Sequence, residues 1–159
     1  MATPGVYLMS RLLLVEDYPP LAKVVAIGLQ RLGHEVERAG NLERAKQFAG
    51  PFDLAILDLE LPDGDGVELA GFLFEKGTVA QVVFFTASRD AALRSAALEF
   101  GPIVEKDRGT EELSRKVVEL LQMLQISREA VAVGAEVNPV DGAPRTSRKF
   151  SGLRRKVDG

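Results

Sequence analysis

Residues 54–66 have the sequence LAILDLELPDGDG, in which four apolar residues lead directly into an acid and a Pro/Gly-rich segment follows. A short apolar run bounded by turn residues is typical of a strand buried in a parallel sheet. Asp58 would then lie at the carboxyl edge of that sheet, where open α/β sheets bind their ligands. An aspartate at this place is either a functional group or a residue that caps a turn through its side chain. The residues at the ends of the other strands distinguish between these interpretations.

The composition is ordinary for a globular protein, with 46% hydrophobic and 27% charged residues in a chain of 159. The absence of cysteine excludes disulfides, thiolate nucleophiles and Cys-ligated metals, and the single histidine excludes a multi-His metal site. We predict that this residue, His34, is a solvated turn residue. No apolar run approaches the ~20 residues of a membrane span, and the N-terminus has no secretory signal. We therefore expect a cytoplasmic protein without a membrane span.

Apolar strands alternate with amphipathic helices from residue 11 to residue 126. The expected strands are 11–15, 35–38, 53–57, 79–85 and 103–105. The expected helices follow Tyr18, Asn41, Gly66, Ser88 and Thr110, with Asn41, Ser88 and Thr110 as caps and the last helix ending near Ile126. Such alternation predicts an α/β fold with a parallel sheet and helices on both faces. Right-handed crossovers favour the flavodoxin-like strand order 2-1-3-4-5.

The two ends of the chain lack this pattern. Residues 1–10 are interpreted as an N-terminal leader, because Met9 directly precedes the first strand. Residues 127–159 collect Gly, Pro, Ser and charge, which predicts a flexible tail. From Arg145 onward the tail holds six basic residues and one acid. Clustered Lys and Arg permit weak contact with nucleic acid or another acidic surface. A solvated tail is the simpler interpretation, and nucleic acid is not expected as the main partner.

Charged and polar residues follow four of the five predicted strands: Glu16 and Asp17, then Asp58, Thr86 and Lys106. In the predicted order the first and third strands are neighbours at the switch point, so three carboxylates converge there. Like charges this close favour a bound cation, and carboxylate oxygens are ligands that suit Mg²⁺. A carboxylate can also be a nucleophile that forms an aspartyl phosphate. Phosphoryl transfer then needs mainly positioning and charge neutralisation.

At these residues the sequence resembles the receiver domain of two-component response regulators over residues 11–126. The resemblance rests on LVED at 14–17, DLELPDGDG at 58–66, FTA at 85–87 and the lysine at 106. It implies a phosphoacceptor that promotes its own phosphorylation and dephosphorylation, rather than an enzyme with a separate substrate. The expected donor is a sensor histidine kinase, a phosphotransfer protein or a small phosphodonor. The expected output is a stand-alone receiver that binds a downstream protein.

The resemblance also assigns a role to each residue of the site. Asp58 is the expected phosphoacceptor. Mg²⁺ is the expected cofactor, and Glu16, Asp17 and Asp58 are its expected ligands, helped by the backbone carbonyl of Glu60. The expected contacts of the phosphoryl group are Thr86 and Lys106. Phosphorylation is then expected to shift an existing equilibrium that remodels the face made by the fourth helix, fifth strand and fifth helix.

Two positions depart from the family pattern. The family usually has Tyr or Phe three residues before the lysine, and the inward rotation of this ring accompanies phosphorylation. Here the position is Ile103, which has no ring. The proline that usually follows the lysine is Asp107, so the cis peptide bond of that position is expected to be absent. These departures leave a second interpretation open, in which a receiver-fold interaction module acts independently of phosphorylation.

Other sites fit the sequence less well. Phosphatases of the haloacid-dehalogenase type also place an aspartate nucleophile after an apolar strand, but they need a second Asp where this chain has Glu60. The segment Asp63–Gly66 suggests a calcium loop, but the sixth loop position would be Glu68 instead of Gly. The first strand is not followed by the glycine pattern of a dinucleotide site.

Overall fold

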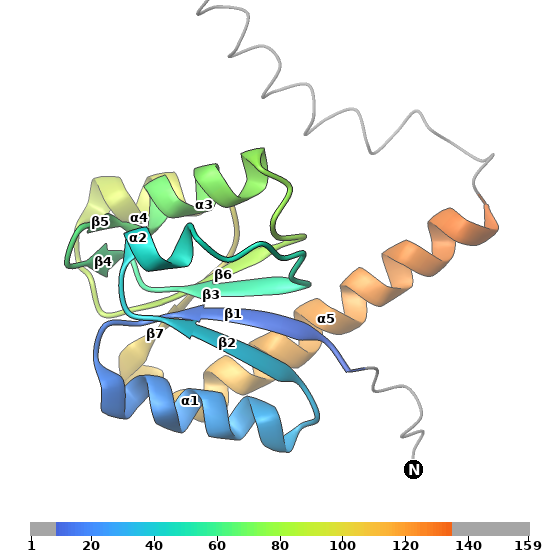
Figure 1. Cartoon of the computed structure of the whole chain (residues 1–159), viewed down its shortest axis with the longest axis horizontal. Coiled ribbons are helices and arrows are strands. Elements are labelled where there is room, and N and C mark those ends of the chain that lie inside the picture. Colours follow the sequence, from blue (N-terminus) through green and yellow to red (C-terminus); the bar gives the residue numbers. More distant parts are fainter. Residues whose placement is uncertain (1–8, 135–159) are drawn as a thin grey trace, which may run out of the picture. The chain divides into compact units, whose positions relative to one another are not determined.

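The structure is a computed structural model that describes residues 9–134. A parallel sheet of five strands has the order β2-β1-β3-β6-β7 (Figure 1). Because β4 and β5 form a separate pair, β6 and β7 are the fourth and fifth strands of this sheet, and the predicted fold and strand order 2-1-3-4-5 are confirmed. The strands are β1 (Arg11–Val15), β2 (Glu35–Ala39), β3 (Leu54–Leu57), β6 (Val82–Thr86) and β7 (Ile103–Glu105). The helices are α1 (Pro19–Arg31), α2 (Leu42–Ala45), α3 (Gly66–Glu75), α4 (Ala91–Ala97) and α5 (Thr110–Val133), with a short 3₁₀ helix at Lys106–Arg108.

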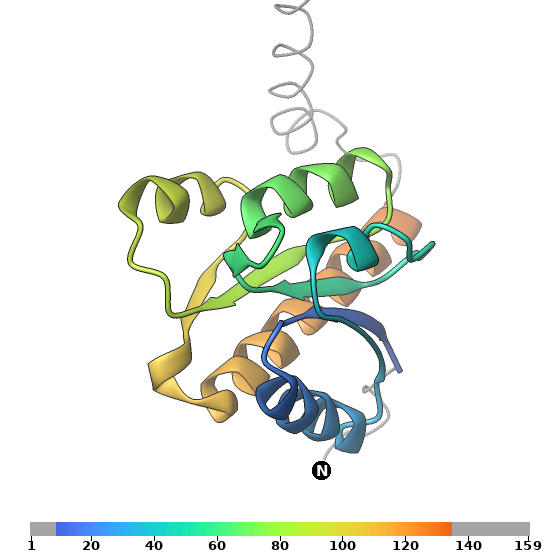
Figure 2. The same cartoon turned by 60° about the vertical axis from the view of Figure 1, so that its left-hand side comes forward.

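Each face of the sheet carries its own apolar core. Successive side chains of a strand point to opposite faces, so Leu13 and Leu57 lie in the core beneath α2, α3 and α4, whereas Leu12 and Ile56 lie in the core beneath α1 and the start of α5. Figure 2 shows the same two layers from a second direction. All four side chains are almost completely buried, and each such residue contributes about 1.5–3 kcal/mol. The two cores fix the strands in place.

The strand register brings the ends of the strands level with one another. Val15 pairs with Leu57, so the residues that follow them, Glu16 and Asp58, leave the sheet side by side. Thr86 pairs with Glu105 at the end of β6 and β7. The sheet therefore presents the residues after β1, β3, β6 and β7 at one edge.

Several local elements differ from the sequence-based prediction. The α2 helix is a single turn, and β6 begins at Val82 because Val79 forms only an isolated bridge with Phe52. The segment after Asp58 forms a small unpredicted hairpin, β4 (Glu60–Leu61) with β5 (Gly64–Asp65). The carboxylate of Asp63 holds this hairpin to α2 by accepting the N–H groups of residues 42 and 43, and these bonds lower the pKa of Asp63.

The predicted end of the last helix, near Ile126, is wrong. The α5 helix continues to Val133. Residues 127–133 contain no Gly or Pro, which permits a helix, and the side chain of Gln125 donates a hydrogen bond to Glu129 one turn away. The predicted flexible tail is therefore helical over its first seven residues, and residues 135–159 lie outside the described residues, as do residues 1–8. The α5 helix is shared by two compact units, one ending at Leu121 and one beginning at Gln122.

The prediction for His34 is also wrong. Its side chain is buried, with 9% exposure, and its Nδ1 accepts a hydrogen bond from the backbone N–H of Ser10 at 3.2 Å. Burial lowers the pKa of this histidine below its ordinary value, so the folded chain favours the neutral ring.

Among the helices of residues 9–134, none combines the length and apolar character needed to cross a membrane.

The loop after β3 depends on a glycine. A Cβ atom at Gly66 would lie 2.2 Å from the backbone oxygen of Asp58, and the N–H of Gly66 donates to the oxygen of Leu59 at 2.9 Å. Only a residue without a side chain lets α3 begin this close to the end of β3.

We expect Gly66→Ala to lower the free energy of unfolding by about 1–3 kcal/mol, because the backbone around Asp58 has to move. Gly28→Ala is the matched control: Gly28 lies inside α1, nothing lies within 4 Å of its added Cβ, and alanine should stabilise the helix by about 0.5–1 kcal/mol. Urea unfolding followed by circular dichroism measures both changes. Equal stability of Gly66→Ala and the unsubstituted chain would contradict this account of the loop.

Candidate functional site

Three acids meet at the carboxyl edge of the sheet. Glu16 and Asp17 follow β1 and Asp58 follows β3, and one carboxylate oxygen from each lies within 4.8 Å of the others. The side chains of Glu16 and Asp58 are buried, whereas Asp17 is exposed. Hard oxygen ligands in this number suit a divalent cation such as Mg²⁺, which usually binds one or two carboxylates and keeps several waters. The donor set therefore fits a metal ion.

A single lysine contacts the two buried acids. Lys106 follows β7, and its Nζ lies 2.7 Å from Oδ2 of Asp58 and 2.9 Å from Oε1 of Glu16. Burial alone would lower the pKa of Lys106, but its hydrogen bonds to Asp58 and Glu16 outweigh burial and raise it. The lysine is therefore charged, and its one ammonium group contacts two of the three acids in the cluster.

The charged form of Glu16 is disfavoured by its burial. Burial raises its pKa above the ordinary value, although the ammonium group of Lys106 and the backbone N–H of Tyr18, at 3.1 Å, both favour the charged form. Removing a carboxylate from water costs more than these contacts return. The site therefore has a deficit of positive charge.

The carboxylate of Asp58 is held from both sides. Its Oδ1 accepts the hydroxyl of Thr86 at 2.8 Å and the backbone N–H of Glu60 at 3.3 Å. Its Oδ2 accepts a hydrogen bond from the ammonium group of Lys106. Thr86 is completely buried and also accepts the backbone N–H of Ser88 at 3.1 Å. These bonds fix the orientation of the carboxylate before any ligand arrives.

The structure brings together the side chains that the strand ends predicted: Glu16, Asp17, Asp58, Thr86 and Lys106. The side chain of Glu60 is exposed, and its backbone N–H was a contact of Asp58 that the sequence did not indicate. Ile103 is half-buried and lines a separate pocket between α4 and β7.

Two other predictions near the site have clear outcomes. Ser88 is not the cap of α4: Asp90 takes this position, and its side chain accepts the N–H of Leu93. The spacing of Asp90 and Leu93 was the available signal, since a capping side chain reaches the N–H three residues on. In residues 9–134 the cis peptide bonds are confined to Gly50–Pro51, so the bond before Asp107 is trans as predicted.

The sequence model of one protein family, the response regulator receiver domain, matches residues 12–118 of the chain. The chain belongs to this family. Among curated proteins, the chain is 29% identical over 118 residues to the response regulator ArlR of Staphylococcus epidermidis, with 72% of this chain and 53% of that protein covered. It is 33% identical over 144 residues to the transcriptional regulatory protein TrcR of Mycobacterium tuberculosis, with 85% and 55% covered.

The chain spans only part of such relatives. It covers 22% of the response regulator protein PilR of Pseudomonas aeruginosa, to which it is 31% identical over 98 residues, or 57% of this chain. It spans about half the length of the ArlR and TrcR relatives.

Solved structures share the fold. The response regulator TrrA of Thermotoga maritima, solved in complex with Mg²⁺ and BeF, is 31% identical, with a TM-score of 0.63 and coverage of 70% of this chain and 99% of that one. A CheY-like receiver domain from Methanospirillum hungatei is 22% identical, with a TM-score of 0.68 and coverage of 76% and 99%. The second likeness concerns the fold alone.

The raised pKa of Glu16 predicts a dependence of stability on pH in the absence of divalent cations. A carboxyl whose folded-state pKa lies above its unfolded value of 4.5 stabilises the fold below 4.5, and this contribution is lost as the pH rises through the folded-state pKa. Glu16→Gln keeps an acceptor oxygen without the charge. We therefore expect it to be more stable than the unsubstituted chain at neutral pH with EDTA, and to lose less stability as the pH rises above 4.5.

Urea unfolding between pH 4.5 and pH 7 measures this difference. Glu60→Gln is the control, because it removes the same charge from an exposed side chain, in the hairpin after Asp58. An unfolding free energy of Glu16→Gln that follows that of the unsubstituted chain at every pH would show that Glu16 is not destabilised by burial.

Proposed function

We propose that Asp58 accepts a phosphoryl group from a histidine kinase or a phosphotransfer protein in a Mg²⁺-dependent reaction, and that the phosphorylated receiver signals by binding another protein. The observation that supports this most strongly is the environment of the Asp58 carboxylate, which lies between the hydroxyl of Thr86 and the ammonium group of Lys106, beside two further acids.

The proposed transfer is a displacement at phosphorus. An oxygen of Asp58 attacks the phosphorus atom, the P–N bond of the donor phosphohistidine breaks, and the imidazole nitrogen keeps the electron pair. With acetyl phosphate the bond that breaks is P–O, and acetate leaves. Hydrolysis of the aspartyl phosphate by water restores the carboxylate and releases phosphate.

Thr86 and Lys106 are proposed to hold the transferred group. Both already bond to the oxygens of Asp58, so a phosphoryl group attached to one of these oxygens meets a hydroxyl donor and an ammonium group. The ammonium group neutralises part of the added negative charge, which is the main requirement of phosphoryl transfer.

Glu16, Asp17 and Asp58 are proposed to hold Mg²⁺, with the backbone carbonyl of Glu60. The ion supplies positive charge that neutralises phosphoryl oxygens and offsets repulsion among the acids. Glu16 and Asp58 are fixed in direction by Lys106, whereas Asp17 is exposed and approachable from water.

A second candidate function is an interaction module whose binding does not depend on phosphate. The observation that favours it is Ile103, which occupies the place of the usual aromatic and cannot report phosphorylation by rotating a ring. Both candidates place the partner on the face made by α4, β7 and the start of α5. They differ in one result: Asp58→Asn weakens binding of that partner only if phosphorylation controls the face.

Incubation with acetyl phosphate and Mg²⁺ should add the mass of one phosphoryl group to the chain, measured by intact-mass spectrometry. Asp58→Asn should add none, because an amide is not a nucleophile of this kind. Asp63→Asn is the matched control, since Asp63 follows in the same segment but contacts α2 instead of the acid cluster. Equal labelling of Asp58→Asn, or no labelling of the unsubstituted chain, would refute the proposal.

Removal of one acid should weaken Mg²⁺ binding directly. We expect Asp17→Asn to raise the Kd for Mg²⁺ by about tenfold or more, because one of the three carboxylates is lost. The measurement is the rise of the thermal unfolding midpoint with Mg²⁺ concentration, which follows from binding to the folded chain alone. Asp107→Asn removes an exposed acid next to Lys106 and should leave the Kd unchanged. An unchanged Kd in Asp17→Asn would remove Asp17 from the proposed ligands.

A further inference from the structure

A closed circuit of bonds links Asp58 to α4. We call it the Arg94 ring, and its members are Asp58, Thr86, Ser88, Arg94, Glu105 and Lys106. The ring has two arms that begin at the two oxygens of Asp58 and meet at the guanidinium of Arg94. Neither the spacing of the motifs nor the family pattern indicated Arg94 or Glu105.

The first arm runs through the loop after β6. The hydroxyl of Thr86 donates to Oδ1 of Asp58 at 2.8 Å and accepts the N–H of Ser88 at 3.1 Å. The carbonyl of Ser88 accepts a hydrogen bond from Arg94 at 3.0 Å. Ser88 is buried, so this loop cannot exchange these bonds for bonds to water without opening. A change at Oδ1 of Asp58 therefore reaches Arg94 through one peptide segment.

The second arm runs through β7. Lys106 donates to Oδ2 of Asp58 at 2.7 Å, and the residue before it, Glu105, forms a salt bridge with Arg94 in which both carboxylate oxygens take part. The hydrogen bond from Arg94 lowers the pKa of Glu105, so this carboxylate is charged. Glu105 also pairs in register with Thr86 across β6 and β7. The two arms are thus tied to each other as well as to Asp58.

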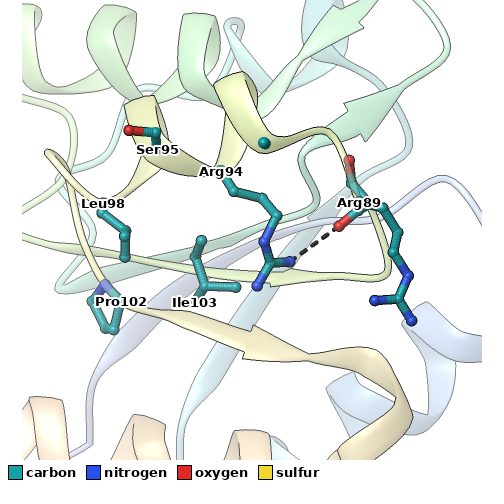
Figure 3. A pocket seen from close by; sticks show the side chains of 8 residues that line it. Arg89, Arg94, Ser95, Leu98, Pro102 and Ile103 are labelled. Atoms are coloured by element: carbon teal, nitrogen blue, oxygen red, sulfur yellow. Dashed lines mark hydrogen bonds between the residues drawn. The ribbon is translucent and has the colours of Figure 1, made fainter.

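Arg94 lies in the same pocket as Ile103, the residue that stands where the family usually has an aromatic side chain. A pocket of ≈ 770 Å³ between α4 and β7 is lined by Arg94 and Ile103, and none of its lining residues is aromatic. Figure 3 shows the side chain of Arg94 extending from α4 past Ile103, with its hydrogen bond to the loop drawn as a dashed line. The side chain is 29% exposed, so most of its surface is covered by the protein.

We propose that Arg94 couples the phosphorylation state of Asp58 to the surface between α4 and β7, in place of a rotating aromatic ring. The inference rests on the proposed phosphorylation of Asp58. A phosphoryl group adds volume and charge at the carboxylate where both arms begin, so the bonds from Thr86 and Lys106 have to change together. The carbonyl of Ser88 and the carboxylate of Glu105 shift with them, and Arg94 carries both shifts to α4. Two arrangements of one bonded element are what coupling between distant groups requires.

The test uses a reporter on α4 and a separate measurement of phosphorylation. The chain has no cysteine, so Leu98→Cys offers one attachment site for an environment-sensitive fluorophore. Leu98 lines the pocket, is 62% exposed and makes no bond of the ring. Acetyl phosphate and Mg²⁺ are added, fluorescence is recorded, and intact mass gives the fraction of phosphorylated chain in the same sample.

We expect the labelled chain to change its fluorescence on phosphorylation. Adding Arg94→Ala should reduce this change by about fivefold or more at an equal fraction of phosphorylated chain. Glu105→Ala should have a similar effect, and the double variant should lose no more than either single variant, since each breaks the same ring. Arg89→Ala removes another arginine of the pocket without breaking the ring and should keep the full change.

The outcomes separate this inference from the proposed function. If the labelled chain takes up no phosphate, both are overturned. If it takes up phosphate and Arg94→Ala keeps the full fluorescence change, only the coupling through Arg94 is overturned. A thermal unfolding midpoint measured without phosphodonor shows that each variant is folded, and a merely structural role of Arg94 would lower this midpoint without removing the response.

Discussion

The site depends on a lysine that shares its charge between two buried carboxylates. Lys106 reaches Asp58 and Glu16 at once, and this contact is possible only because β1, β3 and β7 end at the same edge of the sheet. Two buried acids without the ammonium group would repel each other in a low-dielectric environment. With it they coexist, but a third acid and the raised pKa of Glu16 show that neutralisation is incomplete. The same shortage of positive charge that weakens the fold suits the edge to a cation.

The backbone around Asp58 is as constrained as its side chain. Gly66 packs against the carbonyl of Asp58, and the hairpin between them is fastened to α2 through Asp63. The proposed phosphoacceptor therefore lies between a buried strand and a tightly closed loop. Rigid elements that hold a reactive group in one orientation reduce the reorganisation needed when charge develops on it.

Membership of the receiver family accounts for the side chains at the carboxyl edge of the sheet. It does not account for the side chains between α4 and β7. The chain has the acids, hydroxyl and lysine that the resemblance implied, yet Ile103 replaces the usual aromatic. The salt bridge between Arg94 and Glu105 lies beside Ile103 and connects α4 with β7. Hydrogen bonds differ from a packed ring in being directional, so a small displacement of Ser88 or Glu105 can break them. The proposed coupling through Arg94 depends on this directionality of hydrogen bonds.

The amino-acid sequence was enough to predict the strand order, the buried strand before Asp58 and the five side chains at the sheet edge. These follow from local patterns: apolar runs mark buried strands, and a parallel sheet brings the residues after its strands to one edge. The burial of His34, the hairpin after Asp58 and the pairing of Arg94 with Glu105 were decided only by the tertiary structure. Each depends on contacts between segments whose separation and orientation no local pattern encodes, as when His34 meets Ser10 across 24 residues. The length of α5 is a different case, because residues 127–133 are compatible with a helix or a coil and their local signal did not decide between them.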